Sequence, residues 1–162
     1  MVLQLCHELK QELFRLAGVT SVEVMETFLA CSLLPVLHPH HTISMLAKRN
    51  IISMYSQRPL QSLGRTDFLR IKQLCEESIK ELGKVDPGYP LWKAETLKDL
   101  STALMNLART DFEAGSIDRP EFLAQVKHSM KMVEEASKCK SSIKVERKMD
   151  DGEVLKEEFS SS

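Results

Sequence analysis

Apolar side chains recur at three- and four-residue steps through six segments of this chain, and that spacing is typical of helices with one buried face. The segments cover residues 2–16, 21–34, 39–56, 66–82, 91–114 and 119–138. Leucine, methionine, lysine, glutamate and alanine dominate them, and these residues are good helix formers. Short connections favour antiparallel neighbours, so we expect an all-α fold of about six helices, with antiparallel helical hairpins stacked as a tetratricopeptide-like α-solenoid.

Turn residues predict where individual helices begin and end. Thr20 followed by Glu23 has the spacing of a capping box, which predicts Thr20 as the cap of the second helix. Pro39 suits the first position of the third helix, because its missing N–H is not needed there. Gly83 and Gly115 lie just past the last apolar positions of two helices, where glycine favours a stop.

The apolar periodicity fails near residue 138. The segment 138–162 holds six basic and six acidic side chains with few apolar ones between them. Such a segment has too little apolar surface to offset the entropy of ordering it. The sequence therefore predicts a helical domain over 1–137 and a charged, disordered tail over 138–162.

Charge and cysteine content exclude several classes of protein. The chain has 22 basic and 23 acidic residues and a net charge of −1, which predicts neither a nucleic-acid partner nor a membrane surface. Its apolar runs are shorter than the roughly 20 residues of a spanning helix, and its first residues lack the pattern of a signal peptide. The four cysteines lie far apart in the sequence, which predicts reduced thiols in a cytoplasmic or nuclear protein.

Basic residues gather on the third and fourth predicted helices. The candidate peptide-binding residues are Lys48, Arg49, Arg65, Arg70 and Lys72. In a helical solenoid such a group can clamp the carboxylates of an acidic peptide. Most runs of this kind are simply solvated surface, and the residues alone leave both interpretations open.

The histidines before the third helix are the clearest metal candidates in the chain. Zinc needs three or four converging ligands, and no fourth ligand lies near His38, His40 and His41. A structural role at the helix start explains them better. We therefore assign no metal, cofactor-binding or catalytic residue in this chain.

Two turn motifs and one helix end carry a family resemblance. The stretch 37–41 reads Leu-His-Pro-His-His, 85–89 reads Val-Asp-Pro-Gly-Tyr, and Ala-Arg at 108–109 precedes Glu-Ala-Gly at 113–115. In this order the motifs resemble the C-terminal, tetratricopeptide-like helical region of the SET and MYND domain (SMYD) family, in its arthropod form, over residues 10–137. The turn residues that carry the resemblance structurally are His38, Pro39, His41, Asp86, Pro87, Gly88 and Tyr89.

The resemblance implies part of a protein-lysine methyltransferase without its catalytic parts. In that family S-adenosylmethionine binds the SET domain, and zinc binds cysteines of the SET and MYND regions. This chain has no Asn-His pair and no cysteine cluster, so both groups belong to domains absent from it. The implied function is a non-catalytic interaction or regulatory domain whose partner is a protein or peptide, including its own SET domain. The alternative is a free-standing helical-repeat adaptor that binds peptides or protein tails, and the residues leave open whether the whole gene product is an enzyme.

Overall fold

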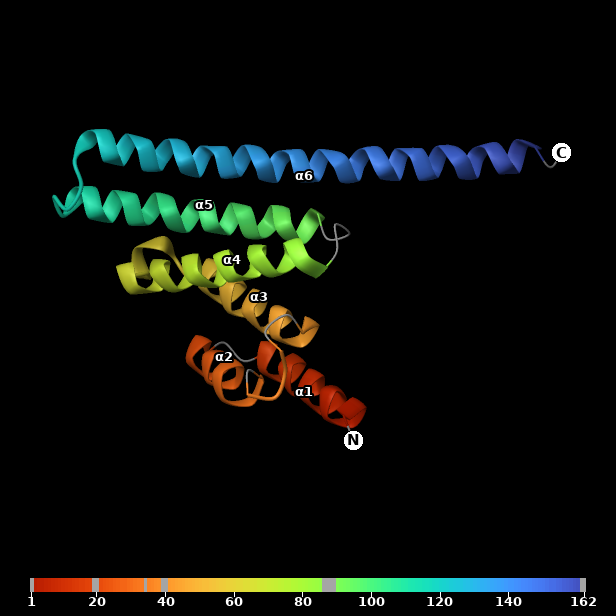
Figure 1. The fold of residues 1–162 in the computed structure, drawn as a ribbon, viewed down its shortest axis with the longest axis horizontal. Coiled ribbons are helices and arrows are strands. Elements are labelled where there is room, and N and C mark those ends of the chain that lie inside the picture. Colours follow the sequence, from red (N-terminus) through yellow and green to blue (C-terminus); the bar gives the residue numbers. More distant parts are fainter. Residues whose placement is uncertain (1, 19–20, 34, 39–40, 86–89, 161–162) are drawn as a thin grey trace. The chain divides into compact units, whose positions relative to one another are not determined.

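The computed structural model describes residues 2–18, 21–33, 35–38, 41–85 and 90–160, with backbone alone at 2, 83–85, 90 and 142–160. The regular elements of these residues are six α-helices, one π-helical segment and one 3-10 turn, with no strand (Figure 1). The prediction of an all-α fold is therefore confirmed. The chain divides into two compact units, Met1–Val85 and Asp86–Ser162, and each is described by itself.

Unit 1 (Met1–Val85) is built around one central helix, α3, which covers Thr42–Ser56. Four other elements pack against it: α1 (Val2–Ala17), α2 (Val22–Phe28), the π-helical segment η1 (Leu29–Leu33) and α4 (Arg65–Val85). A 3-10 turn, η2 (Leu60–Ser62), connects α3 to α4. With neighbours on several sides, α3 is apolar around most of its circumference, as a central helix must be.

The core of unit 1 consists of large aliphatic side chains from every long element. The side chains with almost no exposed surface include Leu13, Met25, Leu33, Ile51, Ile52 and Leu74. Together they come from α1, α2, η1, α3 and α4, so one continuous core joins the whole unit. Cys75 is also fully buried, whereas Cys6, Cys31 and Cys139 retain exposed surface, and none of the four is joined in a disulfide.

Side-chain caps set two helix starts, and both differ from the predicted ones. Ser21, not Thr20, caps α2, since its side chain accepts the backbone N–H of Val24 at 3.4 Å. Thr20 itself lies outside the described residues. The third helix begins at Thr42 rather than Pro39, because His41 Nδ1 accepts the N–H of Ile43 at 3.3 Å and caps it. A ring nitrogen thus takes the place of the serine or aspartate oxygen found in most N-caps.

Unit 2 (Asp86–Ser162) is an antiparallel pair of helices, α5 (Pro90–Glu113) and α6 (Arg119–Ser160) (Figure 1). Small side chains line the contact between them. Ser129 and Ala136 of α6 are buried, and the hydroxyl of Ser101 on α5 donates to the carbonyl of Ser129 at 3.0 Å. Small residues let two helix backbones approach closely. At the turn end of the pair, the rings of Phe112 and Phe122 stack 4.9 Å apart.

The turn between α5 and α6 follows from its sequence. Gly115 adopts φ +69°, and the N–H groups of Gly115 and Ser116 return to the carbonyls of Phe112 and Asp111. This is the Schellman arrangement, which satisfies the last carbonyls of a helix and requires a left-handed residue. Asp118 then caps α6 by accepting the N–H of Glu121 at 2.9 Å. The predicted stop at Gly115 and restart near residue 119 are both confirmed.

Three features differ from the sequence-based expectation or go beyond it. Helix α4 continues past Gly83 to Val85. Helix α6 runs to Ser160, where the charge pattern predicts a disordered tail from 138; its residues are good helix formers, and a formed helix extends at low cost. The division into two compact units at residue 85 goes beyond the sequence-based expectation of a helical domain over 1–137. Stacking of the hairpins as a solenoid stays a prediction.

Candidate functional site

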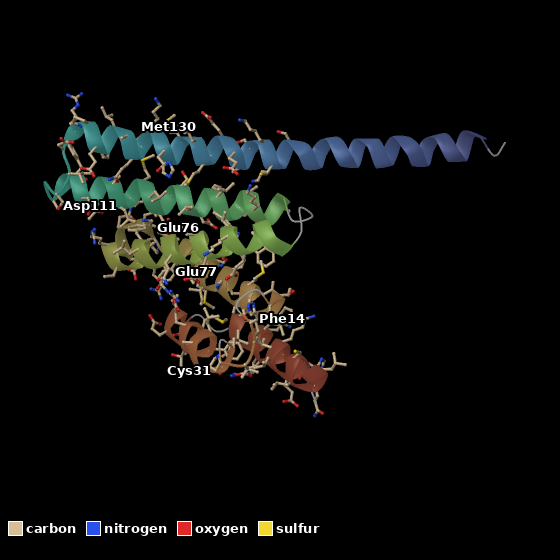
Figure 2. The ribbon with its side chains drawn as sticks, in the orientation of Figure 1. Phe14, Cys31, Glu76, Glu77, Asp111 and Met130 are labelled. Carbon is tan, nitrogen blue, oxygen red and sulfur yellow. The ribbon has the colours of Figure 1, made fainter. Side chains whose placement is uncertain are left out.

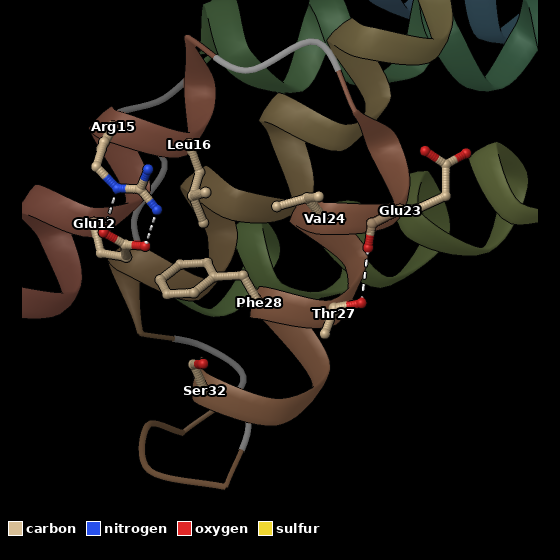
Figure 3. A pocket seen from close by; sticks show the side chains of 8 residues that line it. All are labelled: Glu12, Arg15, Leu16, Glu23, Val24, Thr27, Phe28 and Ser32. Atoms are coloured by element: carbon tan, nitrogen blue, oxygen red, sulfur yellow. Dashed lines mark hydrogen bonds and ion pairs between the residues drawn. The ribbon is translucent and has the colours of Figure 1, made fainter.

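An open groove of about 400 Å³ lies in unit 1 between α1 and the α2–η1 segment (Figure 3). Eight side chains line it: Glu12, Arg15, Leu16, Glu23, Val24, Thr27, Phe28 and Ser32. They come from segments on either side of the connection between α1 and α2. The groove therefore depends on how these two helices cross, which local sequence does not specify.

The floor of the groove is apolar. Leu16 and Phe28 are buried, whereas Val24 keeps 42% of its surface exposed although it lies on the same side of α2 as the floor. In Figure 3 the Phe28 ring lies below Leu16 and beside Glu12, and Val24 lies to the right of Leu16. An apolar side chain entering here would cover surface that is now in contact with water, which is the main source of binding free energy in such pockets.

The rim of the groove is charged and partly ordered by hydrogen bonds. Arg15 donates to both carboxylate oxygens of Glu12, at 2.7 and 2.6 Å, and this two-point bond lowers the pKa of Glu12. The pKa of Glu23 is also lowered, first by its own backbone N–H and then by the Ser21 hydroxyl, which donates at 2.8 Å. Both carboxylates are therefore ionised at neutral pH. Arg58 also lies 3.7 Å from Glu23, so each rim carboxylate has a basic partner within unit 1.

The π-helical segment shapes one end of the groove. A π-helix closes its hydrogen bonds over five residues instead of four, so the turn is wider than in an α-helix. Within η1, Leu29 and Leu33 are buried and Cys31 is exposed (Figure 2). Pro35 cannot donate, and the chain turns instead through the N–H of Leu37, which donates to the carbonyl of Leu33 at 2.7 Å. Single π turns of this kind are frequent at functional sites.

The basic residues expected to bind an acidic peptide do not form one open cationic surface. Lys48 is only 2% exposed, and its ammonium lies 2.8 Å from Glu81 and 3.1 Å from Glu77 on α4. A buried, paired ammonium is part of the packing between α3 and α4 and is not available to a peptide. Lys48 is therefore removed from the candidate peptide-binding residues.

The other members of that basic group also have acidic neighbours or contacts. Arg70 donates to Glu26 of α2, with Nε at 2.7 Å from the carboxylate, and this hydrogen bond raises the pKa of Arg70. Lys72 lies 3.9 Å from Glu76 on the same helix. Arg49 and Arg65 each make an interaction as well. Lys48, Arg70 and Lys72 therefore each face a carboxylate within unit 1.

The turn residues highlighted by the sequence are structural where they are described. His41 caps α3, and its own N–H donates to the carbonyl of His38 at 2.8 Å. Pro39, His40 and the Asp-Pro-Gly-Tyr stretch 86–89 lie outside the described residues. Among the residues that the structure covers, no group of three potential metal ligands converges. None of the helices in that part of the chain has the length and hydropathy needed to span a membrane.

The groove residues were not predicted as a site. The exposed fraction of Val24 is the property that distinguishes a groove from a sealed core, and it depends on the neighbouring helix.

Comparison of the chain with models of protein families, with curated proteins and with solved structures gave no match. The resemblance to the SMYD family therefore stays a prediction. The geometry of the groove is the basis on which function is argued here.

Proposed function

We propose that this chain is a non-catalytic helical module that binds a protein segment in the groove between α1 and α2. The observation that carries the proposal is an apolar floor bordered by ionised carboxylates. The matching segment has one bulky apolar side chain next to lysine or arginine. Lys48, Arg70 and Lys72 already face carboxylates within unit 1, which argues against the acidic peptide expected from the basic residues.

The floor and the rim contribute differently to such a complex. Burying one leucine- or phenylalanine-sized side chain contributes about 1.5–3 kcal/mol, and this sets the affinity. Glu23, whose side chain is 77% exposed and 3.7 Å from Arg58, is the carboxylate most open to a basic segment, and such a contact mainly affects specificity and association rate. One pocket of this size supports weak to moderate binding, as expected for a regulatory contact.

The same proposal includes the family context. The order of the turn motifs supports a C-terminal helical region of the SMYD kind, located in the cytoplasm or nucleus, with the SET domain among its protein partners. Sequencing the transcript upstream of the first codon tests this point. A continuous reading frame with an Asn-His pair and clustered cysteines supports the SMYD context, and an in-frame stop directly upstream supports the free-standing adaptor.

Selection of random displayed peptides against the whole chain tests the groove. We expect the recovered peptides to share an apolar residue flanked by basic ones. Their affinity should fall at least tenfold in Val24→Lys, which places a cation on the floor, corresponding to about 1.4 kcal/mol. Fluorescence anisotropy with labelled peptide measures the change.

The matched control is Leu60→Lys, at an exposed leucine of η2 that does not line the groove. Circular dichroism confirms that both variants keep their helix content. Equal loss of affinity in both variants, or selection of acidic peptides that bind Val24→Lys normally, contradicts the proposal.

A further inference from the structure

Arg58 is the internal partner of Glu23, the more exposed of the two carboxylates on the rim of the groove. Arg58 follows the end of α3, and its Nη2 lies 3.7 Å from Glu23 Oε1 in the first turn of α2. In Figure 3 Glu23 lies beyond Val24, on the side away from Glu12 and Arg15. Glu23 and Val24 are consecutive and both line the groove. A segment that places an apolar side chain on Val24 therefore brings its neighbouring residues close to the carboxylate that Arg58 faces.

The contact between Arg58 and Glu23 is weak enough to be exchanged. At 3.7 Å it is longer than a hydrogen bond. Both side chains are open to water, Arg58 at 36% and Glu23 at 77%. Exposed pairs of this kind contribute little, because water and salt screen the charges. A lysine or arginine that approaches Glu23 to hydrogen-bond distance forms the stronger contact.

Arg58 keeps other favourable interactions when it loses Glu23. Its guanidinium lies over the ring of Tyr55, 5.5 Å from the centroid, and Tyr55 is buried, which fixes the position of the ring. The backbone N–H of Arg58 donates to the Tyr55 carbonyl at 3.0 Å. Arg58 also follows Gln57, the C-cap of α3, where the last carbonyls of a helix favour a cation. The exchange therefore leaves no buried or isolated charge.

The other arginine–carboxylate pair of α2 differs in each of these respects. Arg70 of α4 donates to both oxygens of Glu26, at 2.7 and 2.5 Å, and both side chains are partly buried. A two-point bond with little access of water is strong and fixes the relative position of its two helices. Of these two pairs, only the one at Glu23 is open to an incoming cation, and the Glu26 pair holds α2 in place while Glu23 is used.

We propose that Arg58 competes internally with the basic residue of a bound segment for Glu23, and so determines how strongly the groove prefers basic segments. The proposal rests on the proposed function of the groove. In the free chain Arg58 faces Glu23, and in the complex the cation of the segment replaces it. The loss of the Arg58 contact offsets part of the electrostatic gain, so a basic segment without an apolar side chain binds poorly. Arg58 thereby makes contact with the apolar floor the main requirement for binding.

Two forms of one selected peptide, with its basic residues kept or replaced by norleucine, test the proposal in fluorescence anisotropy. Arg58→Met removes the charge and retains most of the side-chain length. It should raise the affinity for the basic peptide about two- to fivefold, the size of one exposed ion pair. The affinity for the norleucine peptide should stay unchanged. The matched control is Lys72→Met, which removes the same charge at a position that does not line the groove, and it should change neither affinity.

Glu23→Gln distinguishes competition from general repulsion between cations. If Arg58 acts through Glu23, Arg58→Met has no further effect in a chain that already carries Glu23→Gln. An equal gain with and without Glu23 overturns the inference, as does an unchanged ratio of the two peptide affinities in Arg58→Met. Either result leaves the groove itself intact as a binding site, because the loss of affinity in Val24→Lys tests that separately. Failure to select any peptide overturns both, and circular dichroism confirms folding of each variant.

Discussion

Units 1 and 2 pack their helices together with different kinds of side chain. Unit 1 surrounds α3 with helices and fills the space between them with leucine, isoleucine and methionine, together with one buried ammonium. Unit 2 brings two helices close along serine and alanine and leaves Leu123, Met130 and Val133 exposed. A many-sided core depends on volume and on satisfied charge, whereas a close two-helix seam depends on smallness. The two units should therefore fail under opposite kinds of substitution.

The largest effect is expected at Lys48 of unit 1. Lys48→Ala leaves Glu81, itself 5% exposed, without its buried cation, and breaking such a pair costs about 3–5 kcal/mol. Urea unfolding followed by circular dichroism measures the loss. The control is Lys72→Ala, whose partner Glu76 is 3.9 Å away at the surface, with an expected loss of about 0–1 kcal/mol. Equal losses of stability in the two variants would show that the ion pair between Lys48 and Glu81 does not stabilise unit 1.

In unit 2 the sensitive change is an increase in size. Ala136→Leu inserts three carbons into the seam with α5, and overpacking of this kind costs about 1–3 kcal/mol. The control is Ala124→Leu, at an exposed position of the same helix, which should change the stability little. Urea midpoints compare the two. If Ala136→Leu is as stable as Ala124→Leu, the seam is looser than the structure shows.

One glycine in each unit extends the comparison of the two units to backbone conformation. Gly115→Ala should cost about 1–2 kcal/mol, because its φ of +69° is unfavourable for any residue with a Cβ. Gly64→Ala should be close to neutral, since a Cβ there meets only side-chain oxygens at 3.7 and 3.8 Å. Thermal unfolding of both variants gives the difference. A smaller loss at Gly115 than at Gly64 contradicts the Schellman turn.

The smallest expected effect is a dependence on pH that differs in direction between the units. The pKa of Glu12 in unit 1 is lowered by Arg15, so its contribution is present above the unfolded value of 4.5 and is lost as pH falls. The pKa of Lys93 in unit 2 is raised by Glu135, so its contribution is present below 10.5 and is lost as pH rises through the folded value. Urea midpoints in acid and alkali measure both.

The matching variants separate these two contributions. Glu12→Gln should lose less stability than the wild type on acidification, and Lys93→Met should lose less on alkalinisation. Identical acid profiles for Glu12→Gln and the wild type would contradict the first assignment.

Several local features of the fold could be predicted, because their causes lie within a few residues. Gly115 ends α5 through its φ, and Asp118 starts α6 through its side chain. The cap of α2 was misplaced by one residue, since Thr20 and Ser21 are both good caps and only the crossing of α1 and α2 distinguishes them. The cap of α3 was not predicted either. His41 accepts the N–H of Ile43 with a ring nitrogen, in a role that another residue type usually has.

The position of Lys48 within α3 indicated that its side chain would be buried. Lys48 lies four residues after Ser44 and three before Ile51, both fully buried, so its position on α3 is that of a core residue. Its charge suggested the opposite. The contact of Arg70 with Glu26, 44 residues apart, had no local signal at all.

By itself the sequence determined the helical fold and the turn at Gly115, because hydrogen-bond period, capping and glycine conformation act over a few residues. Only the tertiary structure decided which charges are buried, where α2 widens into a π turn, and that Leu16, Val24 and Phe28 border an open groove. Those outcomes depend on which helices meet and at what angle. The contacts involved join residues far apart in the chain, and no periodic pattern in the sequence indicates them.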